Sequence, residues 1–416
     1  MIERTNIGIF GKINAGKSTL MNLITQQITS IVDPSFGTTT DIKISHMEIH
    51  DLGAIKLFDT AGIDEVGSLG DKKRQKTFEC LKQCDLVLLV VDPNSEFDQN
   101  KDIIDHCKKY KKSLLLIINN FKKKVNKIKQ INFSYPKISL DLTKKNSKEI
   151  LINFILENFK KIKNQNLLFP YLKPNDIVFL NIPMDEETPE KRLLKPQAFV
   201  QENLIRRYIS TFAYRMDLAK ARSKNKNIRN SEFLRFQEAI LHLKKISNFK
   251  LVITDSQAID IIHPWTLDKK NKPIIDITTF SIIMASQQGD LNHFLDGIEV
   301  LKKLKKNDKI LIAEACNHNR IKEDIGTFQI PNIINQYYGE NKIQIDHAFG
   351  RDFASYNLQD YKLIIHCGGC MLDKQKMQSR IQDLKDADVP ITNYGLILSF
   401  FQSEMAFSRV ILPFQK

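Results

Sequence analysis

A glycine loop near the start of the chain constrains the fold more than any other feature. The apolar run N-I-G-I-F at 6–10 leads into G-K-I-N-A-G-K-S at 11–18, and an apolar helical pattern follows. This order of strand, glycine loop and helix is what a Walker A phosphate loop requires, because its backbone amides surround phosphates at the start of a helix. Lys17 is expected to reach the β- and γ-phosphate oxygens, and Ser18 to bind Mg²⁺. The loop therefore predicts an α/β nucleotide-binding domain.

Two further motifs have the order expected of nucleotide switches. G-T-T-T-D at 37–41 contains Thr39, which can ligate Mg²⁺ only when the γ-phosphate is present. D-T-A-G at 59–62 follows an apolar strand, which places Asp59 where it can hold Mg²⁺ through water. The amide of Gly62 can then sense the γ-phosphate. These motifs predict a nucleoside triphosphatase that changes conformation with its nucleotide.

The three motifs, in this order, resemble the translation-factor class of GTPases, in particular the Era-like and tRNA-modification (TrmE) branch. Asn14 and G-T-T resemble the potassium-activated members, in which that Asn helps to bind K⁺. Ile63 stands where Ras-like proteins carry a catalytic Gln, so slow intrinsic hydrolysis is implied, with Asp64, Glu65 or Asp71 as possible substitutes. The resemblance implies catalytic roles for Lys17, Thr39, Asp59 and Gly62, and nucleotide contacts from Gly11, Asn14, Ala15, Gly16, Lys17, Ser18, Thr19, Thr39, Asp59 and Asn119.

The guanine-reading motif departs from the pattern of those GTPases. After the apolar strand at 114–118 they carry N-K-x-D, whose Asp accepts two guanine N–H bonds. Here N-N-F-K at 119–122 keeps Asn119 but puts Lys122 in the Asp position, and an ammonium group cannot accept hydrogen bonds. Asp141, just after S-L at 139–140, is the nearest carboxylate in sequence that can replace it. We expect GTP to bind, with weaker discrimination against ATP than those GTPases have.

Two further regions follow a proline-containing linker at 167–175. In each region apolar strands alternate with helical patterns, which predicts a small parallel α/β unit. D-S at 255–256 follows a strand and is expected to cap a helix rather than to catalyse. The expected strands are 177–183, 249–254, 309–313, 362–365 and 389–393, and the expected helices are 196–207, 233–246, 371–386 and 395–407.

Three cysteines and two histidines form two tight groups in the last region. C-N-H at 316–318 and H-C-G-G-C at 366–370 each lie just past the end of an expected strand, which is the edge where open parallel sheets carry their sites. Structural zinc and an iron–sulfur cluster held by thiolates both suit these ligands, and the chemistry alone leaves the two open. The other cysteines, Cys80, Cys84 and Cys107, are expected to pack as small apolar side chains.

Over nearly its whole length the chain resembles the HydF family, the GTPase maturation factors of FeFe-hydrogenase. Cys316, His318, His366, Cys367 and Cys370 meet the family signature C-x-H…H-C-x-x-C. Supporting blocks are D-T-A-G-I-D at 59–64, T-D-S-Q-A at 254–258, A-E-A-C at 313–316 and I-T-N-Y-G at 391–395. The resemblance implies three α/β domains: a P-loop GTPase domain at 1–166, a dimerisation domain at 172–275 and an iron–sulfur domain at 276–416.

The same resemblance implies the cofactors and partners. Cys316, Cys367 and Cys370 would hold a 4Fe-4S cluster, and the fourth iron would be bound weakly by His318, His366 or Glu323. The nucleotide domain would use GTP, with Mg²⁺ on Ser18 and Thr39 and with K⁺ on Asn14. Such proteins act as homodimeric scaffolds that take a transient diiron precursor from two radical-SAM maturases and deliver it to apo-FeFe-hydrogenase.

Composition bears on the remaining alternatives. No apolar run approaches the ~20 residues of a membrane span and the first residues lack a signal sequence, so we expect a cytoplasmic protein with no membrane partner. The net charge of +14 permits a second hypothesis, an Era/TrmE-like RNA-associated GTPase with structural zinc. That hypothesis needs an RNA-binding module and none is recognisable, so nucleic acid is not the expected partner. A third hypothesis, a redox enzyme, lacks a flavin or substrate motif.

Overall fold

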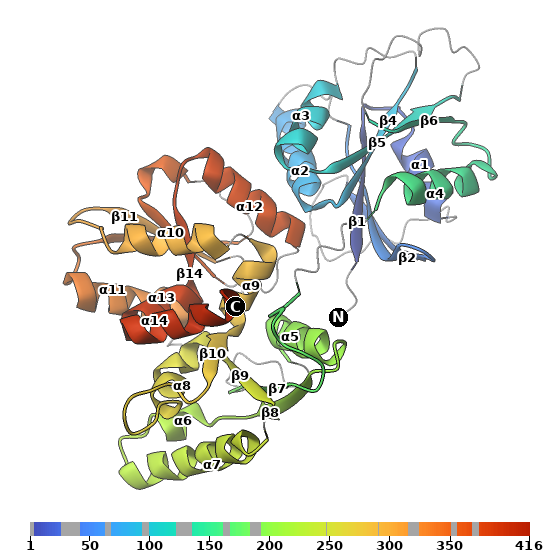
Figure 1. Ribbon diagram of the computed structural model, residues 1–416. Coiled ribbons are helices and arrows are strands. Elements are labelled where there is room, and N and C mark those ends of the chain that lie inside the picture. The colour runs from blue at the N-terminus through green and yellow to red at the C-terminus, as the bar shows by residue number, and fades with distance from the viewer. Residues whose placement is uncertain are drawn as a thin grey trace. The chain divides into compact units, whose positions relative to one another are not determined.

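The computed structural model describes the chain in two compact units (Figure 1). The first unit comprises Met1–Asn164 with Asp373–Ser379, and the second comprises Gln165–Leu372 with Arg380–Lys416. The described residues are 4–25, 42–62, 68–93, 100–121, 135–160, 167–183, 193–246, 248–289, 291–314, 324–350, 356–367 and 374–416. Among them, no helix has the length and apolar character that crossing a membrane requires.

A six-stranded sheet forms the centre of the first unit, in the order β2-β3-β1-β4-β5-β6. β2 is antiparallel to β3, and the other neighbours are parallel. The strands are β1 (Thr5–Gly11), β2 (Lys43–Ile49), β3 (Gly53–Asp59), β4 (Leu86–Val91), β5 (Ser113–Asn119) and β6 (Lys137–Leu140). The helices are α1 (Lys17–Thr25), α2 (Ser68–Gln83), α3 (Lys101–Lys109) and α4 (Ser147–Asn158). The sequence-based prediction of an α/β nucleotide domain is confirmed.

Helices cover both faces of this sheet, which explains why its central strands are buried along their whole length. β1 and β4 are buried at every position, because strands covered on both faces expose neither set of side chains to water. α1 and α4 lie on one face, and α2 and α3 on the other (Figure 1). Cys80, Cys84 and Cys107 are all buried in the α2–α3 core, which confirms their expected role as small apolar side chains.

The second unit contains two four-stranded sheets, ordered β10-β9-β7-β8 and β12-β11-β13-β14, and every neighbouring pair is parallel. The strands are β7 (Ile177–Asn181), β8 (Ser210–Tyr214), β9 (Phe249–Thr254), β10 (Asp276–Thr279), β11 (Lys309–Glu314), β12 (Gln344–Phe349), β13 (Leu363–His366) and β14 (Ile391–Asn393). Two parallel α/β sheets are what the alternating pattern predicts.

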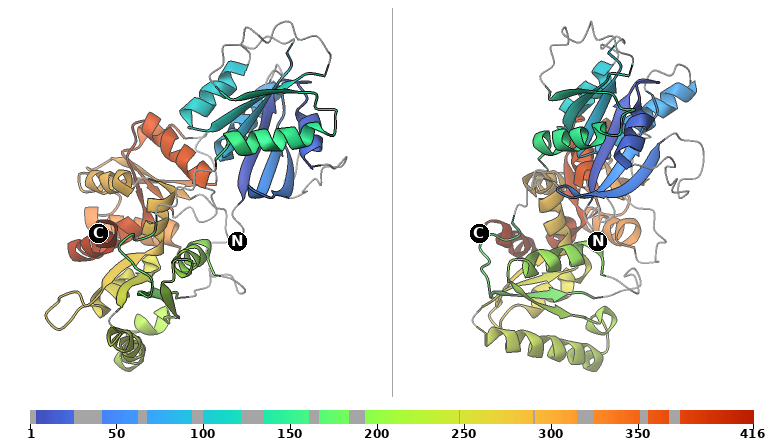
Figure 2. Two further views of the ribbon diagram at one scale, coloured as in Figure 1. Left: turned by 45° about the vertical axis from the view of Figure 1, so that its right-hand side comes forward. Right: turned by 90° about the vertical axis from the view of Figure 1, so that its right-hand side faces the viewer.

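Helices flank both sheets, and Figure 2 shows α5 and α7 on opposite sides of the first one. The helices are α5 (Lys195–Ile205), α6 (Leu218–Ala221), α7 (Lys226–Lys244), α8 (Ile259–Trp265), α9 (Phe280–Gln288), α10 (Leu291–Leu301), α11 (Ile330–Tyr338), α12 (Lys374–Asp386), α13 (Tyr394–Gln402) and α14 (Glu404–Ile411). The single helix predicted over 395–407 is wrong. Its residues form two helices, because Ser403 adopts an extended conformation and its hydroxyl caps α14.

The expected cap at 255–256 is also wrong. Asp255 stands at the N-terminus of a 3-10 turn, Ser256–Ala258, but its carboxylate makes no cap hydrogen bond to that turn. Both of its oxygens accept instead from Nε2 of Gln197 on α5, at 3.2 and 3.1 Å. A tertiary partner that lies 58 residues away in sequence has replaced the local one.

A buried arginine fastens α14 to α8 and to the residues before β10. Arg409 donates from Nη1 to the carbonyl of His263, at 2.9 Å. Its Nη2 donates to Oγ1 of Thr266, at 2.9 Å, and to the carbonyl of Ile275, at 3.0 Å. Burial, together with the neighbouring guanidinium charge, lowers the pKa of His263. The last long helix of the chain is thus joined to the first sheet of this unit by a buried polar contact.

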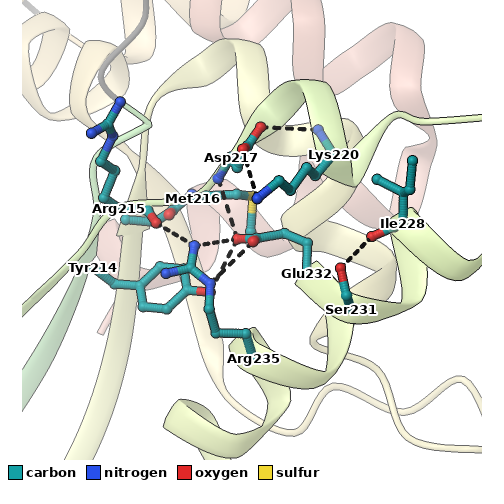
Figure 3. Close-up of polar contacts among 10 residues, drawn as sticks. Tyr214, Arg215, Met216, Asp217, Lys220, Ile228, Ser231, Glu232 and Arg235 are labelled. Atoms are coloured by element: carbon teal, nitrogen blue, oxygen red, sulfur yellow. Dashed lines mark hydrogen bonds and ion pairs between the residues drawn. The ribbon is translucent and has the colours of Figure 1, made fainter.

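A second buried polar group anchors the edge strand β8 (Figure 3). Glu232 of α7 is 3% exposed and accepts hydrogen bonds from three directions. The donors are the Tyr214 hydroxyl at 3.1 Å, the Asp217 amide at 3.2 Å, and Nε and Nη2 of Arg235 at 3.0 and 2.6 Å. A buried carboxylate with this many donors is costly to remove, because its donors lose their acceptor.

Glu232→Ala is therefore expected to lower the free energy of unfolding by about 3 kcal/mol. The single tryptophan, Trp265, packs against Phe236 of α7 with ring centroids 5.7 Å apart, so its fluorescence during urea denaturation reports on this region. Glu202→Ala is the matched control: Glu202 pairs with Arg206 on the surface of α5, and its loss should cost no more than about 1 kcal/mol. Equal losses in the two variants would contradict this account of Glu232.

Candidate functional site

The glycine loop lies between β1 and α1, as the sequence predicts. Gly11 and Gly16 have φ angles of 149° and 106°, and Asn14 lies in the left-handed region with φ of 59°. Glycine and asparagine are the residues that reach these conformations at least cost. Lys17, the first residue of α1, is buried, and its ammonium group donates to the carbonyl of Lys12 across the loop at 2.7 Å. The loop thus brings the N-terminus of α1 and the ammonium group of Lys17 together. Both attract negative charge, so this part of the loop suits a phosphate group.

The expected Mg²⁺ ligands lie beside this lysine. The Ser18 hydroxyl donates to Oδ2 of Asp59 at 2.8 Å, so the two motifs that sequence reasoning paired are in contact. Oδ1 of Asp59 is buried and has no hydrogen-bond partner among the described residues. Burial raises the pKa of Asp59, while the Ser18 hydrogen bond and the Lys17 charge oppose that rise. An orphaned buried carboxylate oxygen beside a serine hydroxyl fits a hard divalent cation such as Mg²⁺.

Asn119 has a structural role that sequence reasoning missed. Its Nδ2 donates to the carbonyl of Ala15 at 3.1 Å, which ties the end of β5 to the phosphate loop. A Cβ on Gly16 would lie 2.4 Å from this amide nitrogen, so Gly16 is needed for space as well as for its φ angle. Oδ1 of Asn119 is buried without a partner among the described residues, and it is available to a bound base or to the loop that follows.

Several residues expected at this site lie outside the described residues. They are Thr39 of the first switch, Ile63, Asp64 and Glu65 of the second, and Lys122 of the base-reading motif. Asp71 is described and lies exposed on α2. Asp141 is described too: Oδ1 of its carboxylate accepts from the amide and the hydroxyl of Thr143, at 3.1 and 2.6 Å. These hydrogen bonds lower the pKa of Asp141. Its role as a replacement for the guanine-reading Asp stays a prediction.

The proposed potassium contact can be tested at Asn14. Asn14→Gly keeps the left-handed backbone without strain and removes only the side-chain amide. We expect hydrolysis by the unaltered protein to be faster in K⁺ than in Na⁺, and the variant to run at one common, slower rate in both salts. Phosphate release in matched KCl and NaCl buffers measures this. Equal rates for the unaltered protein in the two salts would remove the basis for the Asn14 role.

Cys367, the described cysteine of the signature, lies at the carboxyl edge of the second unit's second sheet. β11 ends at Glu314 and β13 at His366, and these neighbouring strands are parallel, so they end at the same edge. Cys367 comes directly after β13, and its amide donates to the carbonyl of Ala313 at 3.0 Å. Cys316, His318, Glu323 and Cys370 lie outside the described residues. Within the described part of the chain, no three Cys, His, Asp or Glu side chains gather as metal ligands would.

His366 is fully buried, and both of its ring nitrogens are engaged. Nδ1 lies 2.6 Å from the carbonyl of Cys367, and Nε2 lies 3.2 Å from Nε of Arg380 on α12. Burial, then the charge of Arg380, lowers the pKa of His366 to about 3. A neutral imidazole that donates from Nδ1 and accepts at Nε2 satisfies this geometry. The arrangement favours His366 as a residue that orients the Cys367 backbone over His366 as a metal ligand, and nothing in the sequence marked Arg380.

Comparison with known protein families divides the chain into three matched segments. Residues 6–120 match the model described as 50S ribosome-binding GTPase. Residues 167–289 match the hydrogen maturase F dimerization domain, and residues 292–413 match the hydrogen maturase F tetramerization domain. The two maturase models together cover nearly all of the chain beyond the nucleotide domain.

Individual relatives match shorter parts of the chain. GTPase Der of a Nitratiruptor species is 38% identical over 114 residues, which are 27% of this chain and 24% of Der. The tRNA modification GTPase MnmE of Prochlorococcus marinus (strain MIT 9301) is 32% identical over 171 residues, which are 39% of this chain and 36% of MnmE. The crystal structure of Aquifex aeolicus Era is 19% identical with a TM-score of 0.31, covering 51% of this chain and 93% of Era.

The chain thus spans only about a quarter to a third of the length of these curated relatives. What they share with it is the GTPase character of its first segment, whereas the two maturase models account for the rest of its length. With a P-loop GTPase-type domain followed by the dimerization and tetramerization domains of hydrogen maturase F, the chain belongs to the hydrogen maturase F family.

Proposed function

We propose that this protein is a GTPase of FeFe-hydrogenase maturation that works in the cytoplasm. In this proposal it carries a 4Fe-4S cluster, receives a diiron precursor from radical-SAM maturases and transfers that precursor to apo-hydrogenase. The observation that carries the proposal is that one chain holds a phosphate loop with its Ser18–Asp59 contact and both maturase domains. A dimerization and a tetramerization domain also support assembly into oligomers, of which a homodimer is the simplest.

The nucleotide chemistry follows from the residues around the phosphate loop. Lys17 and the amides of 11–18 would hold the phosphates, and Ser18 with Asp59 would hold Mg²⁺, directly or through water. Thr39 and the Gly62 amide would respond to the γ-phosphate. Bound Mg²⁺ would neutralise charge that develops on the phosphates. The chain's own part is to position the nucleotide and to exclude water around it.

We assign the thiols to an iron–sulfur cluster and not to zinc because the chain belongs to the hydrogen maturase F family. Three cysteines supply one thiolate fewer than a complete 4Fe-4S ligand set, which leaves one iron with a replaceable ligand, as a carrier site needs. Cys367 directly follows β13, which is parallel to its neighbour β11, and β11 ends two residues before Cys316 in sequence. The cluster would supply a binding point for the diiron cargo. His318 and Glu323 would compete for the fourth iron, while His366 is held by Arg380.

Iron and acid-labile sulfide analysis of anaerobically purified protein tests the proposal. We expect about four irons and four sulfides per chain, together with GTP hydrolysis that depends on Mg²⁺. Zinc in place of iron would favour the second candidate, an RNA-associated GTPase with a structural zinc site. The relative MnmE, a tRNA modification GTPase, and the net charge of +14 are the observations behind that second candidate.

A further inference from the structure

The two sheets of the second unit have the same topology. Numbered along the chain within each sheet, the strands lie in the order second, first, third, fourth: β8-β7-β9-β10 and β12-β11-β13-β14. All pairs in both are parallel. The registers agree as well, because Asn181 pairs with Thr254 in the first sheet and Ala313 pairs with His366 at the same place in the second. Each strand of one sheet therefore has a counterpart in the other.

The turns that precede the two sheets are alike in sequence and in atomic detail. L-K-P-N-D at 172–176 leads into β7, and L-K-K-N-D at 304–308 leads into β11. The asparagines have φ angles of 71° at Asn175 and 72° at Asn307. Each aspartate accepts a hydrogen bond from the lysine amide three residues before it, at 2.8 Å for Asp176 and 2.7 Å for Asp308. Topology alone does not require such agreement in a turn.

The third and fourth strands extend the likeness to sequence. F-K-L-V-I-T-D at 249–255 corresponds to Y-K-L-I-I-H-C at 361–367, and I-T-T-F-S-I-I at 277–283 corresponds to I-T-N-Y-G-L-I at 391–397. α9 and α13, which begin within the second pair of segments, are each 9 residues long, and each is followed by another helix. The second unit therefore consists of two copies of one α/β unit.

The last helix of each copy packs against the last strand of the other copy. α10, at the end of the first copy, packs against β14, where a Cβ on Gly297 would lie 2.2 Å from the Ile391 carbonyl. α14, at the end of the second copy, packs against β10, where the Thr278 hydroxyl donates to the Val410 carbonyl at 2.8 Å. The copies thus share one framework, so corresponding positions can be compared directly.

Comparing corresponding positions in the two copies distinguishes residues that the shared fold requires from residues found only in the copy that contains Cys367. The registers make Ile182 the counterpart of Glu314, Phe280 the counterpart of Tyr394, and Asp255 the counterpart of Cys367. Ile182 and Phe280 are both 2% exposed and form part of an apolar core. The same framework is therefore satisfied by two apolar side chains at these positions, and Phe280 differs from tyrosine only by lacking the hydroxyl group.

In the second copy these positions hold a polar pair instead. The Tyr394 hydroxyl donates to Oε1 of Glu314 at 3.2 Å, and both residues are buried. Burial, then the charges of Cys367 and Glu314, raises the pKa of Tyr394. Burying the carboxylate of Glu314 costs free energy, and the first copy shows that an isoleucine fills the same position of the fold. The presence of Glu314 therefore calls for a reason other than the stability of the fold.

The pair lies against both ends of the segment that carries the first thiol. Glu314 directly precedes 315–323, which includes Cys316, His318 and Glu323. The chain is described again from Asp324, and a Cβ on Gly326 would lie 2.1 Å from Oε1 of Glu314 and 2.3 Å from the Tyr394 hydroxyl. Asp324 fixes this return by accepting from the amides of Gly326 and Thr327 at 2.9 and 3.1 Å. The two ends of the segment are thus held at one polar contact.

We propose that Glu314 and Tyr394 are positioning residues for the cluster: their contact fixes the chain on the two sides of 315–323, at Glu314 and at Gly326, next to the end of β13 that carries Cys367. The inference rests on the proposed function, because it assumes that these thiols hold an iron–sulfur cluster. It adds that the first copy has Ile182 and Phe280 at the positions of this pair, and Asp255 at the position of Cys367.

The test uses the full chain, reconstituted anaerobically with iron and sulfide. Tyr394→Phe installs the residue that the first copy already has and removes one hydroxyl donor from the buried Glu314, so the metal-free variant should stay folded and unfold at a slightly lower urea concentration than the unaltered protein. Its cluster should lose iron to a chelator at least tenfold faster. Its EPR spectrum should change, with the reduced-to-oxidised ratio at a fixed potential shifted about tenfold, or about 59 mV for one electron. Glu314→Gln keeps an oxygen acceptor for Tyr394 and should retain iron better than Tyr394→Phe.

Tyr361→Phe is the matched control. Its hydroxyl also donates to a carboxylate, Oδ2 of Asp346, at 2.9 Å, but it lies before the start of β13, at the opposite edge of the sheet. That variant should keep the iron, the spectrum and the potential of the unaltered protein.

The possible outcomes separate the two proposals. An unaltered protein that takes up no iron–sulfur cluster would overturn the proposed function. A loaded unaltered protein with a Tyr394→Phe variant of the same iron retention, spectrum and potential would overturn the positioning role alone. A metal-free Tyr394→Phe variant that is already unfolded without urea would also overturn it, because the pair would then be required by the fold itself.

Discussion

Cys367→Ala is expected to abolish the visible absorption of the reconstituted protein and the EPR signal of its reduced cluster. The thiol follows β13 at the sheet edge, and with only three cysteines at the site, losing one leaves too few thiolates for a stable 4Fe-4S cluster. Iron and sulfide per chain should fall to near zero in the purified variant. The same result is expected for Cys316→Ala and Cys370→Ala, since the signature makes the three equivalent.

Cys107→Ala is the control for that experiment. Cys107 is 1% exposed in the core of the first unit, and burial raises the pKa of its thiol to about 12, so it is inert toward metal. This variant should keep its full iron and sulfide content. A complete cluster in Cys367→Ala, or an equal loss of iron in both variants, would show that these thiols are not the ligands.

Lys17→Ala should reduce GTP hydrolysis by on the order of 10²–10³-fold, while leaving the cluster intact. Lys17 is the buried cation of the phosphate loop: its ammonium group donates to the loop carbonyl of Lys12, and its neighbour Ser18 contacts Asp59. The cysteines proposed to hold the cluster belong to a different matched segment, so the substitution does not touch them. Phosphate release under saturating GTP, with iron analysis on the same preparation, measures both halves of the prediction.

Lys145→Ala serves as the control for hydrolysis. Lys145 is exposed and lies in the turn before α4, so its removal changes the net charge equally without touching the loop. Hydrolysis within about twofold of the unaltered rate is expected for this control. If Lys17→Ala hydrolysed GTP at the control's rate, the phosphate loop would not be the catalytic site of this protein.

Several polar side chains have hydrogen-bond partners that the sequence did not predict, because those partners come from other elements of the fold. Asp255 follows a strand, where a helix cap is the usual local role, yet Gln197 from another helix binds its carboxylate. His366 belongs to the expected ligand set, yet its Nε2 accepts a hydrogen bond from Nε of Arg380. Tyr394 and Glu314 are 80 residues apart in sequence, and neither belongs to the cysteine and histidine signature. Each of these outcomes depends on which side chain another element brings near.

The sequence by itself determined the elements whose pattern is local. The phosphate loop needs glycine and asparagine at set positions, and β1, β4 and β5 consist mainly of apolar residues because both faces of their sheet are covered. Their existence, order and α/β class were therefore predictable. The packing of the two copies against each other, including that of α10 on β14 and α14 on β10, was not predictable from the sequence. Nor was the particular hydrogen-bond partner that each buried polar side chain has. Those depend on contacts between residues far apart in the chain, whose energies arise only when the sheets are formed and packed.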